Sequence, residues 1–200
     1  INFTYKKYTI PTYTTKILEN EAKLFSEWYI EKKLKKLDKK KFKKSYIKVI
    51  KKLIKKINLK NDTFVHRDFH ISNLMMVKNE IGIIDSQDAL IGNKAYDLAS
   101  LIDDVRFKTS EKFKNEIFNF YLKKQKISNR NYFKSDFDII SVLRNLKIIG
   151  IFTRLAYRDN KKKYLKLIPY AWSLIKLRSK NKENFKDLNL LLKILNNKNR

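Results

Sequence analysis

The sequence predicts an α+β fold that is predominantly α-helical and has one small group of strands in its first half. Apolar residues recur at helical spacing along most of the chain, and two short apolar runs flank a three-residue polar link. Only three glycines and two prolines interrupt the 200 residues. A chain of this length is typical of one domain with its own hydrophobic core. We therefore expect residues 1–200 to form a single domain.

The first helices are expected at 14–37 and 42–58. In both ranges apolar residues return every three or four positions, as on the core-facing side of a helix. In the second range Tyr46, Ile50 and Leu53 share one face and lysines occupy the other. We interpret this lysine run as a solvated helix face rather than as a binding surface.

Five further helices are expected after Gly92, and they make the second half of the chain almost entirely helical. Their ranges are 95–105, 111–125, about 133–155, 161–178 and 185–196. Pro169 falls inside the fourth of them and is expected to kink it, because proline lacks the backbone donor that a helix interior needs.

A strand, a loop and a hairpin are expected before these five helices. Residues 63–66 read as a short strand. The apolar runs Leu74–Val77 and 81–84 are separated by Lys78-Asn79-Glu80, which is the pattern of a β-hairpin. Nearly all the unusual polar residues of the chain lie in this small insert.

The chain is strongly basic, with 47 Lys and Arg residues against 20 Asp and Glu residues and a formal net charge of +27. Such a charge fits a surface for nucleic acid or an anionic membrane. The alternative is compositional bias, since Lys, Asn, Ile, Phe and Tyr are all abundant. Nucleic-acid-binding proteins rely on Arg for bidentate contacts, whereas Lys dominates here. We therefore favour bias and predict no specific nucleic-acid partner.

Several classes of protein are excluded or disfavoured by composition. The absence of Cys excludes disulfides and Cys-based metal sites. No apolar run approaches the roughly 20 residues of a membrane-spanning helix, and the opening INFTYKKYTI is not a targeting segment. We expect a soluble, cytoplasmic protein without a membrane partner. Because the chain begins at Ile1, we also expect it to be part of a longer protein.

The loop after the first predicted strand carries the residues for phosphoryl transfer. Asp68 stands in VHRDFHISN, Asn73 follows five residues later, and Asp85 closes the second strand of the hairpin. Transfer from ATP needs magnesium on the phosphate oxygens and a carboxylate that orients the attacking hydroxyl. Magnesium prefers one or two carboxylates together with phosphates and water. Each residue alone is a weak signal, but their order and spacing together favour Asp68 as the base and Asn73 and Asp85 as metal ligands.

These segments resemble a known family of kinases. HRDFHISNLM followed by IGIIDSQDALIGNKAYDLASLIDD is similar to the aminoglycoside phosphotransferase and choline kinase superfamily, whose fold is related to protein kinases. Within it, the chain most resembles bacterial kinases that phosphorylate N-acetylmuramate and N-acetylglucosamine at the anomeric position. The stretches 19–29 and 150–172 are also similar to that group. The resemblance implies the C-terminal, helical lobe of a kinase-like fold with a catalytic-loop hairpin, and ATP and Mg2+ as cofactors.

The resemblance also implies roles for individual residues. Asp68 corresponds to the catalytic base, and Asn73 and Asp85 correspond to the ligands of magnesium and hence of the nucleotide. Asp97 corresponds to a buried acid that braces the catalytic loop by accepting backbone hydrogen bonds. Its alternative interpretation is an acid that the helix macrodipole favours near a helix N-terminus.

The neighbours of these residues have less specific roles. His66 and Arg67 are expected to be structural, with a phosphate-facing alternative for Arg67. His70 either bonds the loop or approaches the substrate, and the sequence does not decide between the two. Gln87 and Asp88 follow the metal-binding Asp and are expected to contact the acceptor, with a turn-shaping role as the alternative.

Two further groups of residues have both a structural and a functional interpretation. Arg154, Arg158 and Asp159 form either a salt-linked helix end or a lid over an anionic substrate, and the first is favoured. Trp28 and Tyr29 are expected in the core rather than as a platform on which a sugar stacks.

One part of the family pattern has no counterpart in these 200 residues. Full-length relatives place a small β-rich lobe before this region, and that lobe covers the ATP phosphates and supplies a strand lysine. Here the only glycines are Gly82, Gly92 and Gly150, so a glycine-rich phosphate loop is excluded. We therefore expect the isolated chain to be weakly active or inactive.

The favoured function is a small-molecule kinase that acts on an amino sugar in cell-wall recycling. One alternative is a degenerate kinase that serves as a non-catalytic, basic, helical interaction domain. Another is a kinase whose acceptor is choline, an aminoglycoside or another small molecule. The intact set of Asp68, Asn73 and Asp85 favours catalysis, and the sequence does not predict an oligomeric state.

Overall fold

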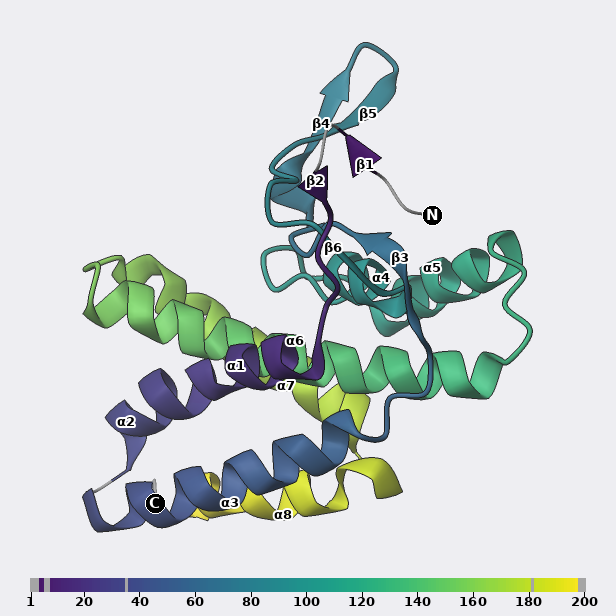
Figure 1. Ribbon diagram of the computed structural model, residues 1–200. Coiled ribbons are helices and arrows are strands. Elements are labelled where there is room, and N and C mark those ends of the chain that lie inside the picture. The colour runs from purple at the N-terminus through teal and green to yellow at the C-terminus, as the bar shows by residue number, and fades with distance from the viewer. Residues whose placement is uncertain (1–3, 6–7, 35, 181, 198–200) are drawn as a thin grey trace. The chain divides into compact units, whose positions relative to one another are not determined.

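The computed structural model describes residues 4–5, 8–34, 36–180 and 182–197, and its fold is α+β and mostly helical, as predicted (Figure 1). Parts of the opening segment and residue 35 of the first predicted helix lie outside the described residues. The chain divides into two compact units, one formed by 1–14 and 58–140 and the other by 15–57 and 141–200. A single domain of 200 residues therefore remains a prediction.

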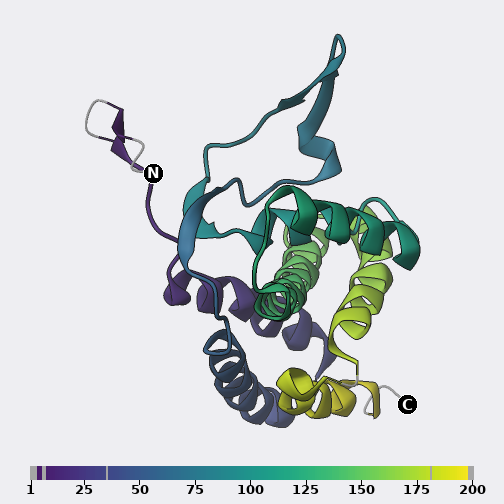
Figure 2. The same ribbon diagram turned by 90° about the vertical axis from the view of Figure 1, so that its right-hand side faces the viewer.

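The first unit contains three two-stranded antiparallel sheets among its described residues. They pair β1 (Thr4–Tyr5) with β2 (Tyr8–Thr9), β3 (Asn61–Val65) with β6 (Leu90–Asn93), and β4 (Leu74–Val77) with β5 (Glu80–Ile83). The predicted hairpin is confirmed, with Leu74 paired to Ile83 and Val77 paired to Glu80. In Figures 1 and 2 this hairpin extends as a narrow arm away from the helices of its own unit.

Strand β6 was not predicted, because four residues that include a glycine give little periodicity. Gly92 of this strand is required because Val65 and Tyr13 lie very close to its backbone. A Cβ atom on Gly92 would lie 3.0 Å from Cγ2 of Val65 and 3.2 Å from Cβ of Tyr13. Glycine therefore lets β6 pack tightly against β3, the strand that leads into the predicted catalytic loop.

The helices of the first unit pack around aromatic side chains. They are α4 (Ala95–Ile102), α5 (Glu111–Lys124) and the part of α6 (Arg130–Tyr157) up to Ile140. Phe118 of α5 packs edge-on against Phe137 of α6, with ring centroids 4.9 Å apart. Ser110 caps α5, since its side chain accepts a hydrogen bond from Phe113 N.

The second unit is built from helices. In chain order they are α1 (Thr15–Leu24), a π-helical turn (Phe25–Tyr29), α2 (Ile30–Lys33), α3 (Lys36–Ile54), the rest of α6, a 3-10 segment (Lys162–Leu167), α7 (Ile168–Ser179), a second 3-10 segment (Glu183–Phe185) and α8 (Lys186–Asn197). Phe25 lies at the centre of an aromatic cluster with Tyr29, Tyr46 and Trp172. On Gly150 of α6 a Cβ atom would lie 2.6 Å from Phe25 N, so only glycine permits this approach.

Two expectations for these helices are tested directly. On α3, Phe42, Tyr46 and Ile50 are buried whereas Lys44 and Lys48 are exposed, which confirms the amphipathic pattern and its solvated lysine face. The kink expected at Pro169 was wrong. Proline occupies the first turn of α7, where its missing N–H breaks no helical hydrogen bond.

The helix expected at 14–37 is interrupted in a way that the apolar spacing did not predict. Residues Phe25–Tyr29 form a π-helical turn between α1 and α2. Such turns add a residue to one helical turn and shift the side chains that follow. No helix among the described residues is long and apolar enough to cross a membrane.

Candidate active site

The predicted catalytic loop begins where β3 ends, at His66. The His66 side chain is 4% exposed, and its Nε2 lies 3.0 Å from the backbone oxygen of Ile84. Because a carbonyl oxygen only accepts, Nε2 must carry the proton and donate. His66 therefore ties the start of the loop to the residue before Asp85, and its purely structural role stays a prediction.

Asp97, on the first turn of α4, holds the same end of the loop. Its Oδ2 accepts a hydrogen bond of 2.7 Å from His66 N, and its Oδ1 accepts one of 3.1 Å from Arg67 N. Arg67 has a φ of 72°, in the left-handed region that residues with a side chain rarely adopt. Such a conformation persists where surrounding contacts enforce it, and both oxygens of Asp97 provide those contacts.

The middle of the loop closes on Asp68 through backbone and side-chain hydrogen bonds. The backbone oxygen of Asp68 accepts from His70 N at 2.9 Å and from Asn73 Nδ2 at 3.0 Å. Asn73 N in turn donates to the backbone oxygen of His70 at 2.9 Å. Because the amide nitrogen of Asn73 donates to Asp68, its Oδ1 is the atom with which Asn73 can coordinate a cation.

The hairpin brings Asp85 to the same loop. Ile84 N donates to the backbone oxygen of Asn73 at 3.1 Å, and the backbone oxygen of Ile84 accepts from His66. Asp85 follows directly, is exposed, and has a φ of 71°. The structure therefore joins the neighbourhoods of Asp68, Asn73 and Asp85 through one set of hydrogen bonds, with left-handed backbone on both sides of it.

The donor set at this loop fits magnesium better than a metal held by protein alone. Among the described residues, no group of three or more His, Cys, Asp or Glu side chains could hold a metal ion. Magnesium commonly takes one or two protein ligands and completes its shell with phosphate oxygens and water. One amide oxygen from Asn73 and one carboxylate from Asp85 match that requirement.

Arg67 and Asp88 lie beside the loop and contact each other. Nη1 of Arg67 donates to the backbone oxygen of Asp88 at 3.1 Å, and the Arg67 guanidinium lies 5.7 Å from the ring centroid of Tyr13. These contacts link Arg67 to its own unit, and both its structural and its phosphate-facing interpretations remain predictions. The side chains of Gln87 and Asp88 are exposed after Asp85, so both their turn-shaping and their acceptor-binding interpretations remain open.

His70 contributes its backbone to the loop, and its side chain is 8% exposed. Its N–H bonds Asp68 and its carbonyl oxygen bonds Asn73, so it holds together the two residues whose spacing predicted the site. Because these are backbone contacts, both interpretations of the His70 side chain remain predictions.

Sequence reasoning missed two buried acids that organise this unit. Asp136 is fully buried, and its carboxylate accepts from Asn58 N, Leu59 N and Asn93 Nδ2 at 2.8–2.9 Å. It thereby connects the segment before β3 to the end of β6. Asp104 is 2% exposed and accepts from Ile71 N at 3.2 Å.

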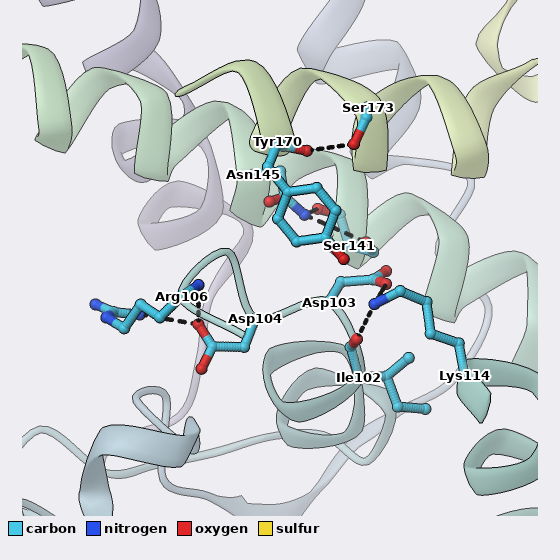
Figure 3. A network of polar contacts seen from close by, with 9 residues as sticks. All are labelled: Ile102, Asp103, Asp104, Arg106, Lys114, Ser141, Asn145, Tyr170 and Ser173. Atoms are coloured by element: carbon cyan, nitrogen blue, oxygen red, sulfur yellow. Dashed lines mark hydrogen bonds and ion pairs between the residues drawn. The ribbon is translucent and has the colours of Figure 1, made fainter. Parts of the chain in front are cut away.

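A signal for Asp104 was present in the sequence. Asp103 and Asp104 follow the C-terminal end of α4, where the helix macrodipole disfavours negative charge. Acids in that position need other partners, and Figure 3 shows them: Arg106 for Asp104 and Lys114 for Asp103.

In the second unit, the structure bears on the expectations for the end of α6 and for Tyr29. Arg158 and Asp159, after the end of α6, form a two-point ion pair with distances of 2.6 and 3.0 Å, as a salt-linked helix end requires. The hydrogen bond from Arg158 lowers the pKa of Asp159 and raises that of Arg158.

Tyr29 stacks on Phe25 but also lines a cavity of about 460 Å³ with Trp172, so packing does not exclude a ligand contact there.

Replacing Asp97 with Asn tests whether its charge holds the loop. Asn keeps the size of the side chain but has one acceptor oxygen where Asp97 uses two. We expect the free energy of unfolding to fall by about 1.5–3 kcal/mol, the usual loss for a hydrogen bond to a charged group. Urea unfolding measures it, with Glu116→Gln on the exposed face of α5 as the matched control. Equal stability of the two variants would contradict the bracing role.

Comparisons with known proteins give several curated relatives of this chain. N-acetylmuramate/N-acetylglucosamine kinase of Neisseria meningitidis serogroup B is 32% identical over 166 residues, which cover 80% of this chain and 50% of that protein. Proteins of the same name from Pseudomonas aeruginosa and Pseudomonas putida are 30% and 29% identical, over 80% and 83% of this chain and 49% and 51% of their own. The chain thus spans about half the length of these curated relatives.

The family match covers the loop itself. The Phosphotransferase enzyme family matches residues 9–133, which include β3, the predicted catalytic loop, the hairpin β4–β5, β6 and α4. The chain belongs to this phosphotransferase family.

Proposed function

We propose that this chain is the helical lobe of an ATP- and magnesium-dependent kinase that phosphorylates a hydroxyl group of an amino sugar. The single observation that carries the proposal is the hydrogen-bonded loop in which Asp68, Asn73 and Asp85 are held in one neighbourhood. Phosphoryl transfer requires little of a protein beyond positioning and charge, so a hydrogen-bonded loop with these three side chains suits it.

The proposed reaction assigns each side chain a task. The half-buried carboxylate of Asp68 takes the proton from the acceptor hydroxyl as that oxygen bonds to the γ-phosphorus of ATP. The bond between this phosphorus and the β–γ bridging oxygen breaks, and ADP leaves. Asn73 Oδ1 and the Asp85 carboxylate would hold Mg2+, which when bound neutralises charge on the phosphate oxygens.

The acceptor is proposed from the relatives, whose names specify N-acetylmuramate and N-acetylglucosamine. We propose the anomeric hydroxyl of such a sugar as the acceptor, in cell-wall recycling. Gln87 and Asp88 are exposed directly after Asp85 and suit the hydroxyl and amide groups of a sugar. Because the reaction consumes ATP, we place the protein in the cytoplasm.

We also propose that the 200 residues work together with a further lobe. The hairpin β4–β5 exposes five large apolar side chains, each between 50% and 73% exposed: Met75, Met76, Val77, Ile81 and Ile83. A two-stranded hairpin is marginally stable without something packed on it, and exposed apolar patches mark contact surfaces. The curated relatives are about twice as long as the aligned region, which is consistent with a covering lobe.

Replacing Asp68 with Asn tests the proposed base. The expected result is a fall in kcat of about 10²- to 10⁴-fold with little change in KM for ATP, because Asn cannot take the proton. Phosphate transfer to N-acetylglucosamine and N-acetylmuramate measures it. The matched control is Asp62→Asn, an exposed acid on β3, which should keep the activity of the unchanged protein. Undiminished turnover by the Asp68 variant would reject the assignment.

Magnesium dependence tests the two proposed ligands. For Asp85→Asn and for Asn73→Ala we expect the Mg2+ concentration that gives half-maximal activity to rise by at least about tenfold, since each change removes a ligand oxygen. Asp88→Asn, three residues after Asp85, should instead change KM for the acceptor. Chelation of Mg2+ should abolish activity in all of them, and an unshifted Mg2+ requirement in the first two would contradict the metal site.

The isolated 200 residues should transfer phosphate much more slowly than the full-length protein. They supply the proposed base and metal ligands but contain only three glycines, none of which lies in a phosphate-binding loop. Positioning supplies much of the rate in such reactions, and we expect at least about a hundredfold difference in kcat/KM. Equal activity of the two forms would show that no further lobe is needed.

A basic interaction domain remains the second candidate, because the exposed face of α3 is lined with lysines, among them Lys40, Lys41, Lys44 and Lys48. Binding to a polyanion through this face would weaken steeply with salt and would be unaffected by Asp68→Asn.

A further inference from the structure

We infer that Asp104 is a second positioning residue for the catalytic loop, so that helix α4 holds the loop at two points. Asp97 on the first turn of α4 bonds His66 and Arg67, and Asp104, two residues beyond the end of α4, bonds Ile71. We call Asp97 and Asp104 together the α4 clamp. The effect on turnover rests on the function proposed above, whereas the effect on the loop does not.

The contact of Asp104 falls at a point where the loop needs a partner. Ile71 begins the 3-10 turn Ile71–Asn73, and the residue before it, His70, makes no side-chain cap. The first N–H groups of a helical turn have no partner within the turn. Oδ2 of Asp104 accepts from Ile71 N at 3.2 Å and thus supplies the missing cap from outside the loop. The turn that it caps ends at Asn73, a proposed ligand of magnesium.

Asp104 is itself fixed in place, which a positioning residue must be. Its side chain is 3% exposed, and its Oδ1 accepts from Arg106 N at 3.0 Å and from Arg106 Nη1 at 3.3 Å (Figure 3). Both carboxylate oxygens are therefore used, one by the loop and one by Arg106. A buried carboxylate without such partners would be strongly unfavourable.

The neighbouring residue anchors the end of α4 to α5. Asp103 is fully buried and forms an ion pair of 3.3 Å with Lys114, which also donates to the backbone oxygen of Ile102. Lys114 is itself buried. This pair fixes the backbone from which Asp104 projects, so displacement of Asp104 would require that the end of α4 also moves.

The α4 clamp brackets the reactive part of the loop. Asp68 lies between the residues held by Asp97 and the residue held by Asp104. Loss of the hydrogen bond between Asp104 and Ile71 would leave β3 and the bond between His66 and Asp97 in place. It would free the 3-10 turn that ends at Asn73. Asn73 would then shift relative to Asp68, and small displacements of reacting groups cost large factors in rate.

The test is Asp104→Asn in the full-length protein. Asn has an NH2 group in place of one carboxylate oxygen, so either Ile71 N or the two donors of Arg106 would face a group that cannot accept. We expect the hydrogen exchange rate of the Ile71 amide, followed by NMR, to rise by at least about tenfold. Turnover should fall about ten- to a hundredfold in kcat, with KM for ATP changed less than about twofold, since the loss lies in positioning rather than in binding.

The matched control is Asp138→Asn in the first part of α6. Asp138 is also a buried acid, 3% exposed, and its carboxylate is paired with Lys134 on the same helix at 2.6 and 2.7 Å. Asp138→Asn removes one negative charge from the first unit, as Asp104→Asn does. We expect it to leave both the Ile71 exchange rate and kcat unchanged, which separates positioning from a general loss of stability.

A milder variant keeps the test decisive if Asp104→Asn does not fold. Arg106→Gln removes the side-chain partner of Asp104 at a position whose side chain is 30% exposed, and it should change exchange and kcat in the same direction but less. Unchanged Ile71 exchange in the folded variants overturns the α4 clamp. Faster exchange with unchanged kcat overturns the positioning role. If the unmutated protein has no kinase activity, the proposed function is overturned. Faster Ile71 exchange in the Asp104 variant would then still support the α4 clamp.

Discussion

The site depends on the carboxylate of Asp97 and the two backbone N–H groups that it accepts. These bonds stabilise left-handed backbone at Arg67, a conformation that costs about 1–3 kcal/mol for a residue with a side chain. The turn at Arg67 directs His66 toward Ile84, and the same turn presents Asp68. The later contacts of the loop, including the hydrogen bond from Asn73 to Asp68, follow this turn along the chain.

Acidic residues have an unusual distribution in this basic protein. The chain has only 20 of them against 47 basic residues, and yet four carboxylates of the first unit are almost completely buried: Asp103, Asp104, Asp136 and Asp138. Each accepts hydrogen bonds or pairs with a lysine or arginine. Asp104 and Asp136 accept from backbone N–H groups and so fix backbone geometry, whereas Asp103 and Asp138 pair with lysine side chains. Much of the positive charge lies on the surface, as on the lysine face of α3.

The strands of the first unit serve the site more than the core. Strand β3 delivers the chain to His66, and β6 supports β3 by a close approach at Gly92. The hairpin β4–β5 carries Asp85 back to Asn73 through the Ile84 hydrogen bond. Most of its large side chains are exposed, so the hairpin adds little to the core and much to the placement of one carboxylate. Two of the three sheets among the described residues thus support the predicted catalytic loop.

The sequence by itself determined the features that depend on neighbouring residues. The hairpin, the amphipathic α3 and the order of Asp68, Asn73 and Asp85 all follow from local spacing. The tertiary structure decided the features whose partners are distant: Asp104 meets Ile71 across 33 positions, and Asp136 meets Asn58 across 78. Strand β6, the π-helical turn and the place of Pro169 at a helix start were likewise decided by packing. Apolar periodicity predicts which face of a segment is buried, but it does not predict which distant residues that face contacts.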